Sequence, residues 1–388
     1  MAATESAYFD LYDVPQEHRD FVALVRQLAQ EQIAPRAAEI DATGEYPWDV
    51  RKLLAENDVL ALPFAEEFGG MGTGTLMLQM AVEEIAKVDA SCALILMVQE
   101  LGSLPIQLFG SQELKERFLP RCATGEWSPA FALSEPEAGS DPASMRTHAE
   151  LDEATGEWVI NGQKNWITNA GIADFYVVFA KTDREAGRIT AFVVEKDREG
   201  FDPGQLEHKL GIKGSPTGQP SFTDVRVPQE NVIGEVGRGL GVALGTLEHT
   251  RLGAAAQAVG IAQGAIDYAL AYAKERIAFG KPIAQLPSIQ DKLAVMQTKT
   301  AAARELLYKA CALADRKDPQ APKYSSMAKL FASDSAMEVT VEAVQVLGGY
   351  GYVKEYPVER YMRDAKITQI YEGTNEIQRL VIARQMLR

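Results

Sequence analysis

The sequence predicts an α+β fold that is mostly helical, with its strands confined to the middle of the chain. Helical periodicity dominates residues 1–126 and 236–388, while short β-branched and aromatic runs separated by turn residues fill 127–235. Because helices and strands are grouped rather than alternating, a doubly wound parallel sheet is excluded. We therefore expect three domains with these boundaries: an N-terminal helical domain, a central β domain and a C-terminal helical domain.

The N-terminal region is predicted to be helical from its apolar spacing. The run 18–33 places Phe21, Leu24, Val25, Leu28 and Ile33 on one helix face. Pro47 is placed to begin a short second helix. The runs 76–88 and 90–102 are apolar nearly all round, which predicts buried helices. Their Met and Leu side chains could line an apolar pocket, although ordinary core packing explains each of them as well.

The central region contains four strand-like runs, at residues 157–170, 175–182, 189–196 and 221–227. The stretch 152–158, "DEATGEW", has the composition of a hairpin turn. Short strands at this spacing predict a small antiparallel sheet or barrel.

The third region returns to helical periodicity. A long Ala- and Gly-rich helix is predicted over 238–280, followed by helices over 288–317 and 323–349. Thr374 and Asn375 stand where a last helix would be capped, and Ile377, Leu380 and Val381 follow at amphipathic spacing. Together these elements predict about four antiparallel helices in a bundle.

Composition restricts the kind of partner and compartment. The formal net charge of −15, without a basic patch, argues against nucleic-acid binding and against anionic membranes. The three cysteines are far apart in sequence, which fits a reducing compartment and no disulfide framework. The opening segment "MAATESAYFD" does not resemble a signal peptide, and we found no apolar run of about 18 residues, so we expect a cytoplasmic protein.

Several kinds of catalytic site lack their sequence motif. There is no G-x-G-x-x-G after a strand, no Walker A loop and no G-x-S-x-G elbow. The four histidines are scattered, so no metal site is predicted. These absences favour a cofactor that needs neither a metal nor a Rossmann loop.

Three stretches remain as candidate sites. "FALSEPEAGSDP" (131–142) offers two hydroxyls and Gly139 in a turn-rich loop, which could present backbone N–H groups to a ligand or be only a linker. "NWITNAG" (165–171) places Trp166 and Thr168 two apart, and on a strand they would face the same side, as suits a flat ring. Glu372, between Tyr371 and Gly373, could be a solvated loop charge or a base.

Five motifs in this order resemble the acyl-CoA dehydrogenase family: "LSEPEAGSD", "WITN", "ERIAFGKPI", "QVLGGYGY" and "RDAKITQIYEGTNEIQRL". The resemblance covers essentially the whole chain. It implies an N-terminal helical domain, a central antiparallel β-barrel and a C-terminal four-helix bundle. It also implies bound FAD, an acyl-CoA substrate, a homotetramer built from two dimers, and electron-transferring flavoprotein as the electron acceptor. Fatty-acid or branched-chain amino-acid degradation would be the metabolic setting.

The resemblance also assigns residues to the flavin and the substrate. Trp166 is implied to stack beside the isoalloxazine and Thr168 to bond its reactive nitrogen, while Arg276 is implied to bind the diphosphate of the neighbouring subunit's FAD. The full set implied to contact FAD is Phe131, Leu133, Ser134, Gly139, Ser140, Trp166, Ile167, Thr168, Arg276, Phe279, Gln345, Gly348, Gly349, Thr374, Asn375 and Glu376. The set implied to contact the acyl-CoA is Ser140, Glu248, Arg251 and Gly373. No metal ligand is implied.

The family's chemistry implies a base for the α-proton of the thioester, with the β-hydride passing to the flavin. The resemblance assigns Glu372 as that base and its backbone N–H to the oxyanion site. Some relatives carry the base on the long helix instead, but that position is Thr250 here. Two departures from the family pattern are Pro287, where many relatives have Gln, and Glu137, where a small residue is common.

Two alternative functions of the protein stay open at this point. A related flavin enzyme of the same fold, of the acyl-CoA oxidase or nitroalkane oxidase type, is disfavoured by chain length and by Glu372. A non-catalytic helical scaffold is disfavoured by the intact base and flavin residues. The acyl chain length and branching that the enzyme prefers cannot be read from the sequence, although Ala93, Leu96, Met97 and Leu101 are candidate pocket residues.

Overall fold

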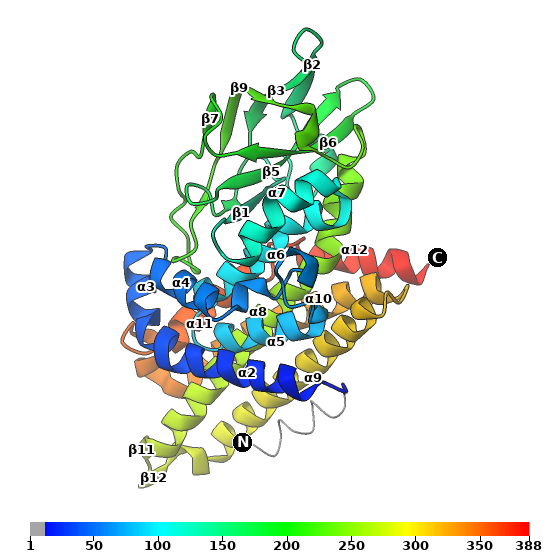
Figure 1. The fold of residues 1–388 in the computed structure, drawn as a ribbon. Helices are drawn as coiled ribbons and strands as arrows, with labels where there is room; N and C mark the ends of the chain where they lie inside the picture. Colours follow the sequence, from blue (N-terminus) through cyan, green and yellow to red (C-terminus); the bar gives the residue numbers. More distant parts are fainter. Residues whose placement is uncertain (1–11, 388) are drawn as a thin grey trace.

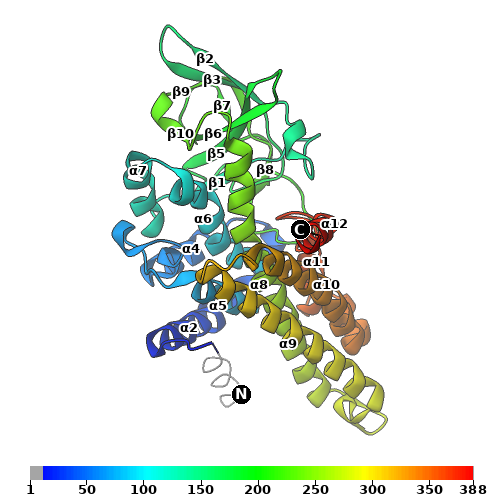
Figure 2. The same ribbon diagram turned by 90° about the vertical axis from the view of Figure 1, so that its right-hand side faces the viewer.

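The structure is a computed structural model that describes residues 12–387. Helices form its lower part and a sheet forms its upper part in the view of Figure 1. The long helix α8 (Gly239–Glu275) runs from the sheet through the helical part to the far end of the molecule, as the turned view in Figure 2 also shows. The prediction about the segment "MAATESAYFD" lies outside the described residues.

The N-terminal region is helical, as predicted. Its helices are α2 (Gln16–Leu28), which continues through a π-helical turn (Ala29–Ile33), α3 (Ala37–Thr43), α4 (Trp48–Glu56), α5 (Gly74–Ala86), α6 (Ala90–Phe109) and α7 (Gln112–Ala123). Pro47 does precede α4 directly. The predicted face of α2 is wrong for Leu24, which is exposed, because the buried stripe runs through Val22 and Val25 to Ile33.

Helix α6 corrects a second prediction. It is long and apolar enough to cross a membrane by length and composition, so the statement that no such run exists is wrong. Most of its side chains are buried inside the protein, in contact with α5 and α8, which is the behaviour of a core helix.

The central sheet contains eight strands: β1 (Pro129–Ala132), β2 (His148–Asp152), β3 (Glu157–Gln163), β5 (Phe175–Asp183), β6 (Arg188–Glu195), β7 (Phe201–Asp202), β9 (Ser221–Val227) and β10 (Val232–Ile233). Their order is β10-β6-β5-β2-β3-β9-β7, with β1 also on β5. β4 (Ile167–Thr168) and β8 (Thr217–Gly218) pair separately.

The antiparallel barrel predicted for this region is wrong in two respects. β1 and β2 both pair with β5 in parallel, so the sheet is mixed. The path ends at β10 and at β7 without a pairing between them, so the sheet does not close. The β2–β3 hairpin around residues 152–157 agrees with the turn prediction.

Five helices, rather than about four, form the C-terminal region. α8, α9 (Pro287–Asp315) and α10 (Ala321–Leu347) are long and contact one another in all three pairs, and the short α11 (Val358–Ile367) and α12 (Asn375–Met386) pack on α10. The prediction missed α11, a ten-residue amphipathic helix that buries Val358, Tyr361 and Ala365. A small hairpin, β11 (Ile277–Ala278) with β12 (Lys281–Pro282), follows α8 at the far end of the molecule.

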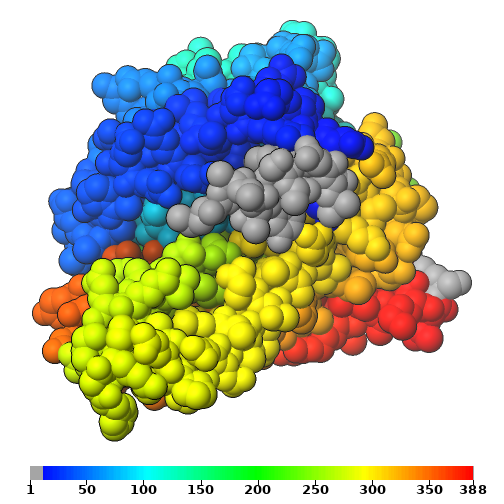
Figure 3. Space-filling view, turned by 90° about the horizontal axis from the view of Figure 1, so that it is seen from below, coloured from blue at the N-terminus to red at the C-terminus, as the bar shows by residue number. Residues whose placement is uncertain are grey.

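The N-terminal and C-terminal helices share one core. Apolar side chains from α2, α5 and α6 are buried together with those of α8, α9 and α10. Seen from below, the N-terminal helices lie directly beside the chain that follows α8 (Figure 3). On α8, Thr250 and Gln257 form hydrogen bonds with Glu372 and Tyr371 of the loop before α12.

Candidate active site

Glu372 lies in a tight turn between α11 and α12. Its φ of 56° and that of Gly373, 86°, are both in the left-handed region, which is uncommon for a glutamate. A Cβ on Gly373 would come within 2.8 Å of the Gln378 amide nitrogen, so glycine is required there for both reasons. Thr374 then caps α12 by accepting a bond from the Ile377 N–H at 3.4 Å.

The Glu372 carboxylate points at α8. The Thr250 hydroxyl donates to Glu372 Oε2 at 2.9 Å. Burial raises the pKa of Glu372, while the Thr250 bond and the charges of Arg251 and Lys329 oppose that rise. The turn therefore holds a half-buried carboxyl whose proton affinity is above the ordinary range.

Two polar side chains that were not predicted as site residues hold the backbone of the turn. Lys329, in the middle of α10, donates to the Gly373 carbonyl and to Asn375 Oδ1, both at 2.8 Å. Gln378 donates to the Gly373 carbonyl at 2.9 Å. Burial lowers the pKa of Lys329 to about 7. In the sequence, the signal that could have identified Lys329 is a lysine among the small residues of "SSMAKLFASDSA", inside a predicted helix.

Arg251 follows Thr250 on α8 and is also buried. It donates to Ser326 Oγ on α10 at 2.6 Å and to the Leu247 carbonyl at 2.8 Å. Burial lowers the pKa of Arg251, and the neighbouring Glu248 opposes this. The charge of Arg251 acts on Glu372, and part of its guanidinium is bonded to α10, while Glu248 is half-buried. The predicted contact of Arg251 and Glu248 with the acyl-CoA stays a prediction.

We expect Thr250→Val to move the acid limb of the kcat/KM profile to higher pH, because it removes the hydrogen bond that holds the Glu372 pKa down. Activity should then fall off earlier as the pH is lowered. Thr246→Val is the matched control, since Thr246 is buried one turn away and bonds only to the Val242 carbonyl. An unchanged limb in Thr250→Val, measured over the full pH range, would show that this bond does not tune Glu372.

The loop 131–142 and the β4 segment lie next to each other. The Asn165 N–H donates to the Ser134 carbonyl at 2.9 Å. Beneath them the buried Lys164 donates to Glu135 at 2.8 Å and to the Leu133 carbonyl at 3.1 Å. This buried ion pair, which the sequence analysis missed, joins the two predicted flavin motifs.

The predicted flavin residues of these segments differ in exposure. Trp166 is 59% exposed, with a φ of 62°, so it precedes β4 instead of lying on a strand with Thr168 as expected. Gly139 and Ser140 are exposed, and Ser134 and Thr168 are half-buried. Phe131 is half-buried against Phe179, whereas the side chains of Leu133 and Ile167 lie in the core.

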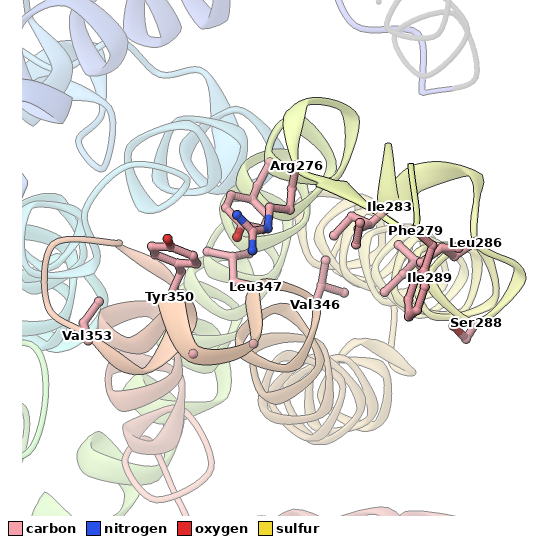
Figure 4. A pocket seen from close by; sticks show the side chains of 14 residues that line it. Arg276, Phe279, Ile283, Leu286, Ser288, Ile289, Val346, Leu347, Tyr350 and Val353 are labelled. Carbon is pink, nitrogen blue, oxygen red and sulfur yellow. The ribbon is translucent and has the colours of Figure 1, made fainter. Parts of the chain in front are cut away.

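A second group of predicted residues lies at the far end of α8. Arg276, Phe279, Gly348 and Gly349 line a cavity of about 640 Å³ together with Tyr350 (Figure 4). The Arg276 guanidinium lies 5.3 Å from the Tyr350 ring centre, and Phe279 is 88% exposed. Gly348 has a φ of 61°, and a Cβ on either glycine would meet nothing within 4 Å. Gln345 is exposed and does not line this cavity.

The two groups are far apart within one chain. Thr250 and Arg276 are separated by nearly all of the remaining length of α8, roughly 40 Å at the α-helical rise.

The remaining predicted residues lie at the start of α12, where Glu376 is exposed and Asn375 is buried against α10. Among the described residues, no group of three or more His, Cys, Asp or Glu side chains could hold a metal ion.

Comparison with known proteins gives matches over nearly the whole chain. Family models described as the N-terminal, middle and C-terminal domains of acyl-CoA dehydrogenase match residues 15–126, 130–225 and 237–387. The chain is 49% identical over 382 residues to a probable acyl-CoA dehydrogenase, FadE25, of Mycobacterium tuberculosis, covering 98% of each chain.

Solved structures give the same result. Butyryl-CoA dehydrogenase from Megasphaera elsdenii matches with a TM-score of 0.94 and 43% identity, covering 97% of this chain and 99% of that one. A chain in a structure described as electron transferring flavoprotein of Acidaminococcus fermentans matches with a TM-score of 0.94 and 42% identity, with the same coverage. An acyl-CoA dehydrogenase complexed with FAD from Bacillus anthracis matches with a TM-score of 0.91 and 34% identity, covering 97% and 68%.

Proposed function

This chain belongs to the acyl-CoA dehydrogenase family, and we propose that it converts an acyl-CoA thioester to the trans-2-enoyl-CoA with Glu372 as the base. The observation that carries the assignment is the geometry of Glu372. Its carboxylate is half-buried and oriented by Thr250, and its turn, with two residues at positive φ, is held by Lys329 and Gln378. A solvated loop charge would have none of these restraints.

The residues present fit FAD, the cofactor named for one of the solved relatives. The cavity at Arg276 combines a guanidinium, which can bind a diphosphate bidentately, with two glycines whose missing side chains leave the wall open. For the flavin ring we propose the exposed Trp166 and the half-buried Thr168, together with Glu372 and Thr374 from the start of α12. When bound, FAD supplies the acceptor for the β-hydride.

The protein's part in the reaction is to bind the thioester and take its α-proton. A carboxylate with a raised pKa is a better match for a weakly acidic carbon than an ordinary one. The Glu372 main-chain N–H makes no hydrogen bond to any described residue, so it is free to donate to the thioester oxygen as negative charge develops there.

The direct test is product analysis. The flavin-loaded protein, given butyryl-CoA and an artificial electron acceptor, should form crotonyl-CoA, identified by chromatography against the authentic compound. Rapid hydrogen peroxide release in air without the acceptor would indicate an oxidase instead.

Arg276→Ala is expected to lower the flavin content of purified protein by about 10-fold or more, since a charge-assisted diphosphate contact is lost. The measurement is the ratio of flavin to protein absorbance, followed by titration of the apoprotein with FAD. Lys274→Ala is the control, because Lys274 is an exposed cation two residues away that does not line the cavity. Equal flavin content in both variants would remove Arg276 from the cofactor site.

The assembly follows from the separation of the two sites. Because Arg276 lies roughly 40 Å from Thr250 along α8, we propose that it serves the flavin of a neighbouring subunit in a homotetramer. Leu380, Met386 and Leu387 at the C-terminus are more than half exposed, which supports an apolar subunit contact there. The expected electron acceptor is electron-transferring flavoprotein, supported by the Acidaminococcus match.

Two further predictions remain open. We propose the division into domains at 126/127 and 235/236, supported by the ends of the three family matches. A cytoplasmic location stays a prediction.

A further inference from the structure

Two polar side chains are buried close to Glu372 without a structural role. Gln79 on α5 is fully buried, and neither its amide nitrogen nor its oxygen has a hydrogen-bond partner among the described residues. Glu100 on α6 is 8% exposed and forms no ion pair with any described residue. Because buried polar groups are almost always hydrogen-bonded, such a pair points to a partner that the chain itself does not supply.

The packing of three helices places this pair beside the catalytic carboxylate. Gly253 lies one turn beyond Thr250 on α8, and a Cβ there would be 3.7 Å from Gln79 Oε1 and 3.5 Å from Met97. Met97 and Glu100 are three residues apart on α6, so they lie on the same helix face. Because Gly253 has no side chain, this face of α8 stays open beside Gln79 and Met97.

The protonation of Glu100 indicates whether an acyl group that reaches this pair should be charged or uncharged. Burial, followed by the charge of Glu372, raises the pKa of Glu100 to about 8. The Gln79 amide faces Glu100 and opposes this rise, without completing a hydrogen bond. At neutral pH Glu100 is then mostly protonated and can both donate and accept. An acyl group with its own carboxylate would add negative charge beside Glu372 with no cation at the pair to receive it.

Space is also available on the other side of Glu100. A cavity of about 240 Å³ is lined by Glu100, Leu78, Leu104, Thr75 and His249 among others. Its lining combines apolar side chains with the polar groups of Thr75, Glu100 and His249.

Resting on the proposed function, we propose that Gln79 and Glu100 form the end of the acyl pocket and select acyl groups that carry an uncharged hydroxyl at the distal end. The hydroxyl donates to one of the two side chains and accepts from the other, which gives the Gln79 amide one hydrogen bond that the chain itself does not supply. An alkyl group of the same size leaves both unpaired, and sites built around such hydrogen bonds discriminate strongly against the analogue that lacks them.

The experiment compares matched CoA esters on the flavin-loaded enzyme. The pairs are 4-hydroxybutyryl-CoA with pentanoyl-CoA, and 5-hydroxypentanoyl-CoA with hexanoyl-CoA, and the readout is the ratio of kcat/KM within each pair. We expect the hydroxyl ester to be preferred by at least about 10-fold in one pair. Gln79→Leu and Glu100→Met should each lower that ratio by about 10-fold, Glu100→Gln should largely keep it, and the exposed Glu113→Met is the control.

A second readout is independent of turnover. The rise in the thermal unfolding midpoint on adding each ester should be larger for the preferred hydroxyl ester in wild type, and the difference should disappear in Gln79→Leu. A structural role alone would change the midpoint equally with both esters.

The possible failures can be told apart. Preference for the alkyl ester in both pairs, or the same ratio in wild type, Gln79→Leu and Glu100→Met, would overturn the inference while leaving dehydrogenation intact. A higher kcat/KM for 4-aminobutyryl-CoA than for 4-hydroxybutyryl-CoA would overturn the uncharged assignment. Failure of every ester, butyryl-CoA included, to give product would instead overturn the proposed function.

Discussion

Glu372→Gln should lower turnover by on the order of 10²-fold or more while the protein stays folded and keeps its flavin. The amide has nearly the same shape and still accepts the Thr250 hydroxyl bond, so the turn and its bonds to Lys329 and Gln378 are retained. What is lost is the basicity of a desolvated carboxylate. Steady-state kinetics with an artificial acceptor, alongside the flavin absorbance of the purified protein, measure both parts.

Glu153→Gln provides the control, because Glu153 is an exposed carboxylate in the β2–β3 turn with no assigned contact. Near-normal turnover in Glu372→Gln would remove Glu372 from the role of base. Low turnover accompanied by loss of flavin would instead indicate damage to the cofactor site.

Lys164→Met should be the most destabilising single change in the flavin-binding half of the molecule. Lys164 is fully buried and bonded to Glu135, which also accepts the Arg146 and Thr147 main-chain N–H groups. Removing the lysine leaves a buried carboxylate without its cation, and such losses cost about 3–5 kcal/mol. The Leu133 carbonyl also loses its donor, so the 131–142 loop should loosen and flavin content should fall.

The matched comparison is Lys196→Met, which breaks an ion pair of similar length, 2.7 Å to Asp174 against 2.8 Å for Lys164–Glu135, at an exposed lysine. An exposed pair contributes only about 0–1 kcal/mol. Denaturant unfolding of the two apoproteins measures the difference, and similar free energies of unfolding would show that the buried pair has no special role.

The parts of the fold that could be predicted from sequence are those with a strong local pattern. Buried helices α5 and α6, the 37-residue α8 and the β2–β3 hairpin follow from periodicity and turn chemistry. Two features of the sheet could not be predicted from sequence, because strand order depends on tertiary packing. They are the parallel pairing of β1 and β2 with β5, and the open edge of the sheet. Leu24 was misplaced because the helical face of α2 is set by its contacts with α5.

The residues of the candidate site likewise divide into those that could be predicted from sequence and those that could not. Glu372, Trp166 and Arg276 could be identified because they stand in family motifs. Three other residues could not be identified from sequence, because each acts through a contact with a residue far away in the chain. Lys329 contacts Gly373, Lys164 contacts Glu135, and Gln79 lies against α8 at Gly253. Polar residues inside predicted buried helices were the remaining signal, and they mark positions where tertiary structure must supply a partner.

The central claim, that Glu372 takes the α-proton, is tested most directly by exchange into a thioester that cannot be dehydrogenated. Acetyl-CoA has α-protons but no β-hydrogen, so its exchange with D₂O reports on the base alone. The wild-type enzyme should incorporate deuterium at the α-carbon, measured by mass spectrometry, and Glu372→Gln should be no faster than the buffer. Equal exchange by the two proteins would contradict the assignment of Glu372.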